Sequence, residues 1–207
     1  MIISMSDILC VTNRSLCKED FLTRVEKIAA VHPEGIILRE KDLSEEKYKE
    51  LAGAVLEICR RNGTPCILHS FVKAARELGC TELHLPLHIL RTLGEEEKAG
   101  FTTLGASCHS IEDAVEAESL GCTYITAGHV FDTDCKKGLP GRGLQFLKKV
   151  CESVSVPVYA IGGINAGNIS EVRRAKAAGA CVMSGTMVCD DVRGYLSAFE
   201  EKIDEIQ

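Results

Sequence analysis

Two histidines follow neighbouring apolar runs and are the strongest candidates for proton-transfer chemistry. His109 comes after the run 103–107, and His129 follows the run 123–126 within the glycine-rich segment 128–143. Imidazole suits proton transfer near neutral pH because its unperturbed pKa lies close to the working pH. If the two runs are adjacent strands, roughly 4.8 Å apart, both rings can face one substrate. The competing interpretation is that one of the rings hydrogen-bonds a loop carbonyl.

Arg39 and Lys41 are the best candidates for binding an anionic substrate group. They come directly after the apolar run 35–38, two positions apart, so on an extended chain they share a face while Glu40 points the other way. A solvated charge run is the alternative. An inward arginine is costly without an anionic partner, however, and this favours a substrate contact.

The segment 128–143 carries further polar groups with weaker assignments. Asp132 and Asp134 stand near lysines, so ion pairing within the loop is a better interpretation than a metal site, and no metal is predicted. Cys135 stands next to two lysines, Lys136 and Lys137, whose positive charge favours a reactive thiolate. Cys135 is nevertheless not predicted to be a nucleophile.

Small residues after the last two apolar runs predict a phosphate site. Gly162 and Gly163 follow one run, and Ser184 and Gly185 follow the other. Without bulky side chains, the backbone N–H groups at these positions can approach an anion closely. A sharp turn of the chain is the other use of a Gly-Gly pair.

These groups need a scaffold, and the chain alternates eight short apolar runs with amphipathic stretches. The runs cover residues 7–12, 35–38, 65–68, 82–85, 103–107, 123–126, 156–161 and 180–183. The predicted helices cover 20–30, 44–62, 70–79, 110–121, 144–154, 168–179 and 192–206, with a short or irregular helix inside 86–101.

Continuous apolar strands covered by helices predict a parallel α/β sheet, and eight such units close into a (β/α)₈ TIM barrel forming one domain over residues 1–207. An open, doubly wound sheet is the alternative, disfavoured because no Gly-x-Gly-x-x-Gly follows the first run. In a barrel the carboxyl ends of all strands meet at one mouth. His69, His84 and Ser107 would then join the groups above.

Composition limits the classes of partner. The chain has 207 residues, 45% hydrophobic and 26% charged, and a net charge of -6, which argues against a nucleic-acid or anionic-membrane binder. No signal peptide and no apolar run of about 20 residues is found, so a cytoplasmic protein is expected. The eleven cysteines include no Cys-x-x-Cys and are expected to be free, mostly buried thiols. The oligomeric state is open, a homo-oligomer included.

Five motifs, in this order, resemble the superfamily of thiamine phosphate synthase and the TenI-type thiazole tautomerase. They are Leu38-Arg-Glu-Lys, Gly105-Ala-Ser-Cys-His-Ser, Gly128-His-Val-Phe-Asp-Thr-Asp-Cys-Lys-Lys-Gly, Ala160-Ile-Gly-Gly-Ile and Val182-Met-Ser-Gly. The resemblance implies a (β/α)₈ barrel that binds a small phosphorylated thiazole. It also implies that Ser107, Thr133 and Lys136 are further substrate contacts.

The two branches differ in chemistry, and the departures from the synthase pattern favour the tautomerase. The synthase uses Mg²⁺ to join thiazole phosphate to a pyrimidine diphosphate, and its usual Ile-Asn-Asp motif is Leu68-His69-Ser70 here. The acidic residues after its His-x-Gly-Gln motif are absent from His84-Leu-Pro-Leu-His88, and His129 replaces a proline.

The resemblance therefore implies an isomerase that needs no cofactor. His129 would transfer the proton with help from His109, and Arg39 with Lys41 would bind a substrate carboxylate. Two alternatives remain: the Mg²⁺-dependent synthase, and a non-catalytic thiazole phosphate binder or regulator.

Overall fold

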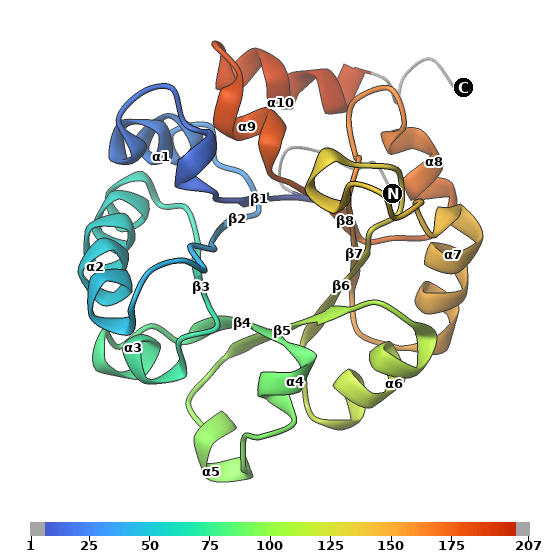
Figure 1. The fold of residues 1–207 in the computed structure, drawn as a ribbon, viewed down its shortest axis with the longest axis horizontal. Helices are drawn as coiled ribbons and strands as arrows, with labels where there is room; N and C mark the ends of the chain where they lie inside the picture. Colours follow the sequence, from blue (N-terminus) through green and yellow to red (C-terminus); the bar gives the residue numbers. More distant parts are fainter. Residues whose placement is uncertain (1–6, 202–207) are drawn as a thin grey trace.

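Eight parallel strands close into a barrel in the computed structural model, which describes residues 7–201 (Figure 1). Each strand pairs with the next along the chain, and the last pairs back with the first. The strands are β1 (Ile8–Val11), β2 (Gly35–Leu38), β3 (Cys66–His69), β4 (Glu82–Pro86), β5 (Thr103–Cys108), β6 (Tyr124–Gly128), β7 (Val158–Ile161) and β8 (Gly179–Val182). The predicted closed barrel is confirmed, and the open sheet is excluded.

Helices surround the barrel and connect its strands (Figure 1). The longer ones are α1 (Phe21–Ala29), α2 (Glu45–Asn62), α3 (Val72–Glu77), α6 (Ile111–Ser119), α7 (Gly143–Ser153), α8 (Ile169–Arg174) and α10 (Val192–Glu201). Shorter turns are η2 (Arg14–Leu16), α4 (Leu87–Leu90), α5 (Glu95–Lys98), η3 (Asp134–Lys136) and α9 (Ser184–Val188). The irregular helix expected within 86–101 is the pair α4 and α5.

One predicted helix was too long. The stretch 168–179 was expected to be helical throughout, but α8 ends at Arg174, and Lys176 has a φ of 68°. Two residues later the Ala178 amide donates to the Val158 carbonyl, 2.8 Å away. The chain leaves the helix early because it must already align with β7. Of the helix expected over 192–206, residues 202–206 lie outside the described part of the chain.

Helix α2 shows how local sequence sets these boundaries. The Ser44 hydroxyl accepts from the Lys47 amide at the helix start, and Gly63 ends the helix with a left-handed φ of 67°. On its inner face, the fully buried Tyr48 donates its hydroxyl to the Leu38 carbonyl at 2.7 Å and accepts from the His69 amide at 2.8 Å. Tyr48 therefore joins the ends of β2 and β3.

Alternation along the strands divides the buried residues into two clusters. The larger cluster packs between strands and helices, and includes Ile8 and Cys10 of β1. The smaller one, inside the barrel, includes Leu9 and Val11 of the same strand. The barrel interior is therefore apolar for much of its length, and polar groups gather toward the strand ends. Within residues 7–201, no helix is long and apolar enough to cross a membrane.

Candidate active site

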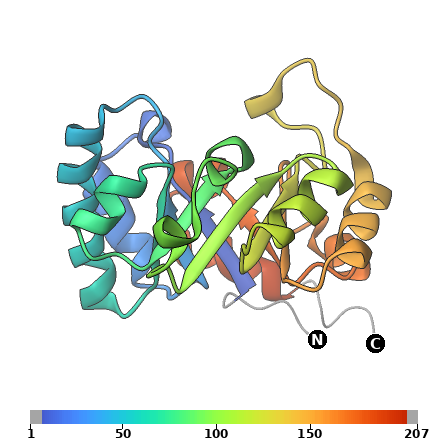
Figure 2. The same cartoon turned by 90° about the horizontal axis from the view of Figure 1, so that it is seen from below.

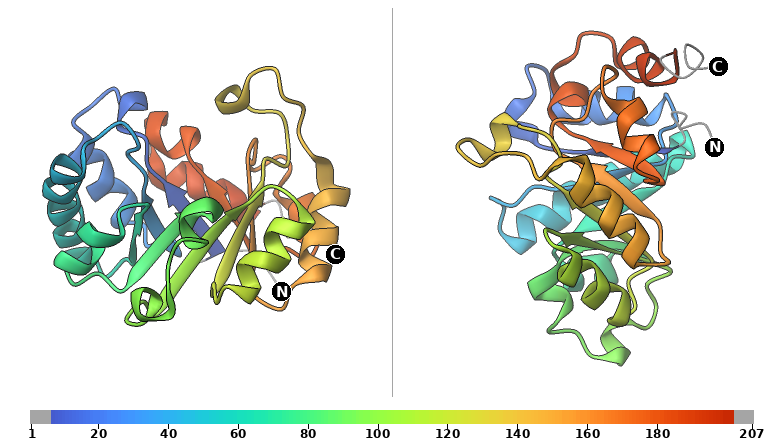
Figure 3. Two further views of the ribbon diagram at one scale, coloured as in Figure 1. Left: turned by 60° about the horizontal axis from the view of Figure 1, so that its bottom comes forward. Right: turned by 90° about the vertical axis from the view of Figure 1, so that its right-hand side faces the viewer.

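A cavity of about 450 Å³ opens at the carboxyl ends of the strands. The segment between β6 and α7 stands beyond these strand ends at one side of the mouth (Figures 2 and 3). Every residue predicted for the site lines this cavity: Arg39, Lys41, Ser107, His109, His129, Thr133, Lys136, Gly162, Gly163, Ser184 and Gly185. The fold thus brings them together, and their individual roles stay predictions.

Both candidate catalytic histidines are anchored by a backbone carbonyl. Nε2 of His129 lies 3.2 Å from the Leu139 carbonyl, and Nδ1 of His109 lies 2.9 Å from the Gly128 carbonyl. A carbonyl only accepts, so these two nitrogens carry the protons. For one of the two rings, a hydrogen bond to a loop carbonyl was the alternative to a catalytic role. Both rings make such a bond. Within residues 7–201, each ring keeps its other nitrogen unbonded and able to accept a proton.

Gly162 lets the His129 loop lie directly against the predicted phosphate turn. The Val130 amide donates to the Ile161 carbonyl at 2.9 Å, and the Phe131 amide donates to the Gly162 carbonyl at 3.0 Å. Gly162 has a φ of 99°, and a Cβ built on it would overlap the Cβ of His129. Only glycine satisfies both conditions, so the imidazole is placed beside the predicted phosphate site.

Three cations gather in the cavity from two connections. Partial burial lowers the pKa of the Lys41 ammonium, and the positive charges of Arg39 and Lys136 lower it further. Arg91 also lines the cavity, but Nε and Nη2 of its guanidinium bind the two oxygens of the Glu116 carboxylate, each at 2.7 Å. Within residues 7–201, Arg39, Lys41 and Lys136 have no such carboxylate partner, so the site favours an anionic ligand.

Asp113 is the one carboxylate that lines the cavity in the described part of the chain. Its Oδ2 accepts from the His109 amide at 2.9 Å, and its Oδ1 lies 3.9 Å from Nη2 of Arg91. Asp113 therefore holds the start of α6 in place. Residues 7–201 contain no group of three or more His, Cys, Asp or Glu side chains placed to hold a metal ion.

His69 and His84 form a neutral floor beneath these charges. They are 4% and 2% exposed, and their rings stack with centroids 5.6 Å apart. Burial, helped by nearby positive charge, lowers the pKa of His69 to about 2 and that of His84 to about 3. His84 bonds the Tyr124 hydroxyl through Nδ1 and the Ser107 hydroxyl through Nε2, each at 2.8 Å. The floor thus offers hydrogen bonds without charge.

Several lining residues were not predicted from the sequence. Thr126 is one of them, although the alternation of β6 places it on the same face as Tyr124, inside the barrel. Tyr195 comes from α10, beyond the last strand, and a Cβ built on Gly185 would overlap its ring. Strand-end reasoning could not have found Tyr195, because it reaches the cavity from a helix.

Known proteins share this chain's sequence and fold over most of its length. The profile of the family described as "Thiamine monophosphate synthase" matches residues 8–186. The chain belongs to this family. Thiamine-phosphate synthase 2 of Streptococcus pneumoniae serotype 4 is 31% identical over 193 residues, 91% of this chain and 90% of that protein. Thiamine-phosphate synthase of Clostridium tetani is 30% identical over 189 residues, 88% of each.

A solved structure supports the same placement in the thiamine monophosphate synthase family. Thiamine phosphate pyrophosphorylase from Pyrococcus furiosus superposes with a TM-score of 0.81 at 27% identity, covering 98% of this chain and 97% of that one. The 3-hexulose-6-phosphate synthase structure, at 17% identity and a TM-score of 0.68, is similar in fold alone. Family membership was thus predicted correctly from the motifs, while the choice between branches depends on the site.

Proposed function

We propose that this protein is a thiazole tautomerase, which transfers a proton within a carboxylated thiazole phosphate and needs no cofactor. The observation that carries the proposal is the position of His129. Its imidazole has an unbonded Nδ1, lies against the Gly162 turn, and shares a cavity with Arg39 and Lys41. A base that shares one cavity with cations and with a glycine turn suited to phosphate matches a substrate that carries a phosphate and a carboxylate.

The reaction would move one hydrogen and conserve all electrons. The substrate is a non-aromatic ring with an exocyclic double bond. His129 Nδ1 removes the proton from ring carbon C2, the double bonds shift, and the exocyclic carbon receives a proton. The product is the aromatic carboxythiazole phosphate. Since the developing aromaticity and the adjacent C=N stabilise the carbanion, the enzyme mainly supplies a positioned acid and base.

The remaining side chains would bind and orient the substrate. Arg39 can meet the carboxylate with two charge-assisted hydrogen bonds, and the Lys41 ammonium adds positive charge. Backbone N–H groups at Gly162, Gly163, Ser184 and Gly185 would hold the phosphate. His109 would assist proton transfer through Nε2, and Ser107, Thr133 and Lys136 would make further contacts.

The synthase reaction is the second candidate, because the relatives that match about nine-tenths of the chain carry that name. The donor set of the cavity does not fit a magnesium diphosphate. Mg²⁺ prefers carboxylate oxygens, and Asp113, the one carboxylate that lines the cavity within residues 7–201, lies 3.9 Å from the Arg91 guanidinium. The positions of the synthase Asn-Asp pair hold His69 and Ser70. A binder or regulator without turnover is the third candidate, and the paired histidines favour an enzyme over it.

The deciding experiment supplies both sets of substrates. We expect the purified protein to consume the non-aromatic carboxythiazole phosphate, and to leave the two synthase substrates unchanged in the presence of Mg²⁺. His129→Asn should lower kcat about 10²- to 10⁴-fold with little change in product affinity. His32→Asn, a change at an exposed histidine that does not line the cavity, is the matched control. Full activity of His129→Asn, or turnover in the synthase assay alone, would overturn the proposal.

A further inference from the structure

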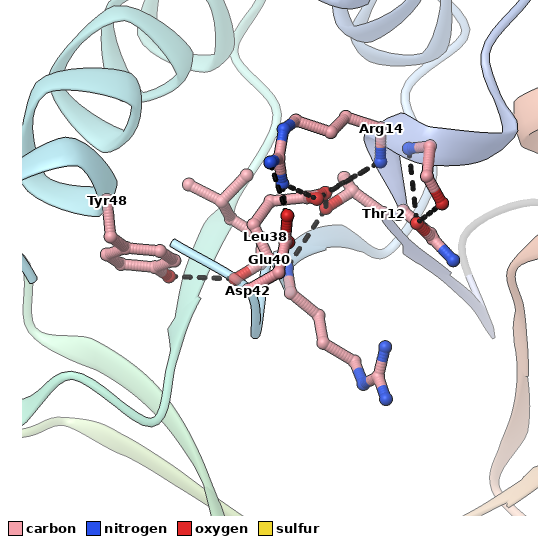
Figure 4. A network of polar contacts seen from close by, with 9 residues as sticks. Thr12, Arg14, Leu38, Glu40, Asp42 and Tyr48 are labelled. Atoms are coloured by element: carbon pink, nitrogen blue, oxygen red, sulfur yellow. Dashed lines mark hydrogen bonds and ion pairs between the residues drawn. The ribbon is translucent and has the colours of Figure 1, made fainter. Parts of the chain in front are cut away.

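A buried carboxylate stands between the two proposed anion-binding side chains. Glu40 is 2% exposed, whereas Arg39 and Lys41 on either side of it line the cavity. Its Oε1 accepts from the Thr12 hydroxyl at 2.7 Å, and both of its oxygens accept from the Arg14 amide at 3.1 Å. Nη1 of Arg14 adds a further bond at 3.1 Å (Figure 4). Such donors offset the cost of burying the charge.

The Thr12 hydroxyl connects this carboxylate to the backbone of Arg39. Thr12 is fully buried at the end of β1, where its amide donates to the Ile37 carbonyl at 2.9 Å. Its single hydroxyl hydrogen is donated to Glu40, and its oxygen accepts from the Arg39 amide at 3.0 Å. Because the carboxylate orients the hydroxyl, it also fixes the backbone from which the Arg39 side chain enters the cavity.

The Arg14 side chain also binds the segment that carries Arg39 and Lys41. Its guanidinium pairs with Glu40 and with Asp42, so it contacts the residues on both sides of Lys41 (Figure 4). Positions 40 and 42 therefore face the β1 connection, while positions 39 and 41 face the cavity. Buried ion pairs are weak stabilisers, and apolar residues of similar volume often replace them without loss. The network at the cavity mouth is therefore better explained by the positions it gives to Arg39 and Lys41 than by a contribution to stability.

We propose that Glu40 is a positioning residue, which acts through Thr12 and Arg14 to aim Arg39 and Lys41 at the second anionic group of the substrate. The inference rests on the proposed function, in which that group is the ring carboxylate. Glu40 itself touches no substrate. Loss of the relay should therefore weaken recognition of the carboxylate and leave recognition of the phosphate intact.

The experiment compares two ligands by calorimetry: an aromatic thiazole phosphate with the ring carboxylate, and the same compound without it. Wild-type protein should prefer the first by about tenfold or more, the value of one charge-assisted contact. Thr12→Val and Glu40→Gln should each remove most of this preference, with the affinity for the second ligand changed less than about twofold. Thr12→Ser keeps the hydroxyl and should keep the preference. Glu57→Gln, the matched control, changes a carboxylate in an exposed ion pair that does not line the cavity, and it should also keep the preference.

Each result has a distinct meaning. If folded Thr12→Val retains the wild-type preference, the positioning role is wrong while the proposed function stands. If Thr12→Val loses both ligands equally, its effect is general damage, which also overturns the inference. If the wild-type protein binds both ligands equally, the carboxylate contact of the proposed function fails, and this inference fails with it. Thr12→Val leaves the Glu40–Arg14 pair in place, so it tests the positioning role even if Glu40→Gln does not fold.

Discussion

Gly162 is the position where the link between backbone shape and catalysis can be tested most directly. Its φ of 99° disfavours any other residue, and an added Cβ would overlap the Cβ and Cα of His129 and approach the Val130 amide nitrogen. Two of these three atoms belong to the backbone, so no rotamer change can relieve the contact. We therefore expect Gly162→Ala to displace the His129 loop from the proposed phosphate turn.

The magnitude follows from two separable costs. A left-handed backbone costs an alanine about 1–2 kcal/mol, and overpacking adds about 1–3 kcal/mol. Gly100→Ala is the matched control, because the exposed Gly100 has a similar φ of 103° but no atom within 4 Å of an added Cβ, and it does not line the cavity. Both variants carry the backbone strain, and only Gly162→Ala carries the collision.

The assay is turnover of the carboxythiazole phosphate together with urea denaturation of both variants. A displacement of about 1 Å at a reacting group can cost 10²-fold in rate, so kcat/KM of Gly162→Ala should fall about 10²-fold or more. Gly100→Ala should lose stability but keep kcat/KM within about threefold, because Gly100 does not line the cavity. If Gly162→Ala had the stability of Gly100→Ala and wild-type turnover, the contact between His129 and the proposed phosphate turn would not matter for catalysis.

Three further outcomes follow from buried polar groups and thiols. Tyr48→Phe leaves the Leu38 carbonyl and the His69 amide unpaired, so the free energy of unfolding in urea should fall by about 1–3 kcal/mol; an unchanged value would contradict the role of Tyr48. His69 has a pKa of about 2 in the folded protein, so below pH 6.5 it takes up a proton only in the unfolded chain. The free energy of unfolding should therefore fall on acidification. His69→Gln should make this fall shallower by about 1 kcal/mol per pH unit between pH 6 and 5. An unaltered slope would show that His69 is not buried in its neutral form. Cys135 is the exposed cysteine of the eleven, so one thiol should react rapidly with Ellman's reagent in the native protein, and Cys135→Ser should abolish that phase.

The barrel was predictable because its strands are buried on both faces and therefore stand out as continuous apolar runs. One of the least accurate strand boundaries shows the physical reason for the error. The run 156–161 was taken as a strand throughout, but β7 begins at Val158, because the amides of Ser155 and Val156 are bonded to the Glu118 carboxylate. Such tertiary hydrogen bonds leave no periodicity in the sequence, and neither does the early end of α8.

The site was predictable to the extent that it depends on strand ends. Arg39 and Lys41 could be assigned to one face because a strand alternates every two residues. The role of Glu40 could not be inferred, since its partners Thr12 and Arg14 are 28 and 26 positions earlier in the chain. For His69 and His84 the sequence indicated only the barrel mouth. Their neutrality depends on burial, which lowers the pKa of both rings and which only the closed barrel creates.

The charge distribution explains how an acidic protein can have a positively charged cavity mouth. The net charge is -6, yet Arg39, Lys41 and Lys136 converge on the cavity. Acidic side chains elsewhere form exposed ion pairs, such as Glu57 with Arg60. Since salt screens charges beyond about 8 Å at physiological ionic strength, the distant carboxylates contribute little to the electrostatic potential at the mouth. Net charge therefore argues against an extended polyanion, which would meet the whole surface, but not against a small anion that meets three cations at close range.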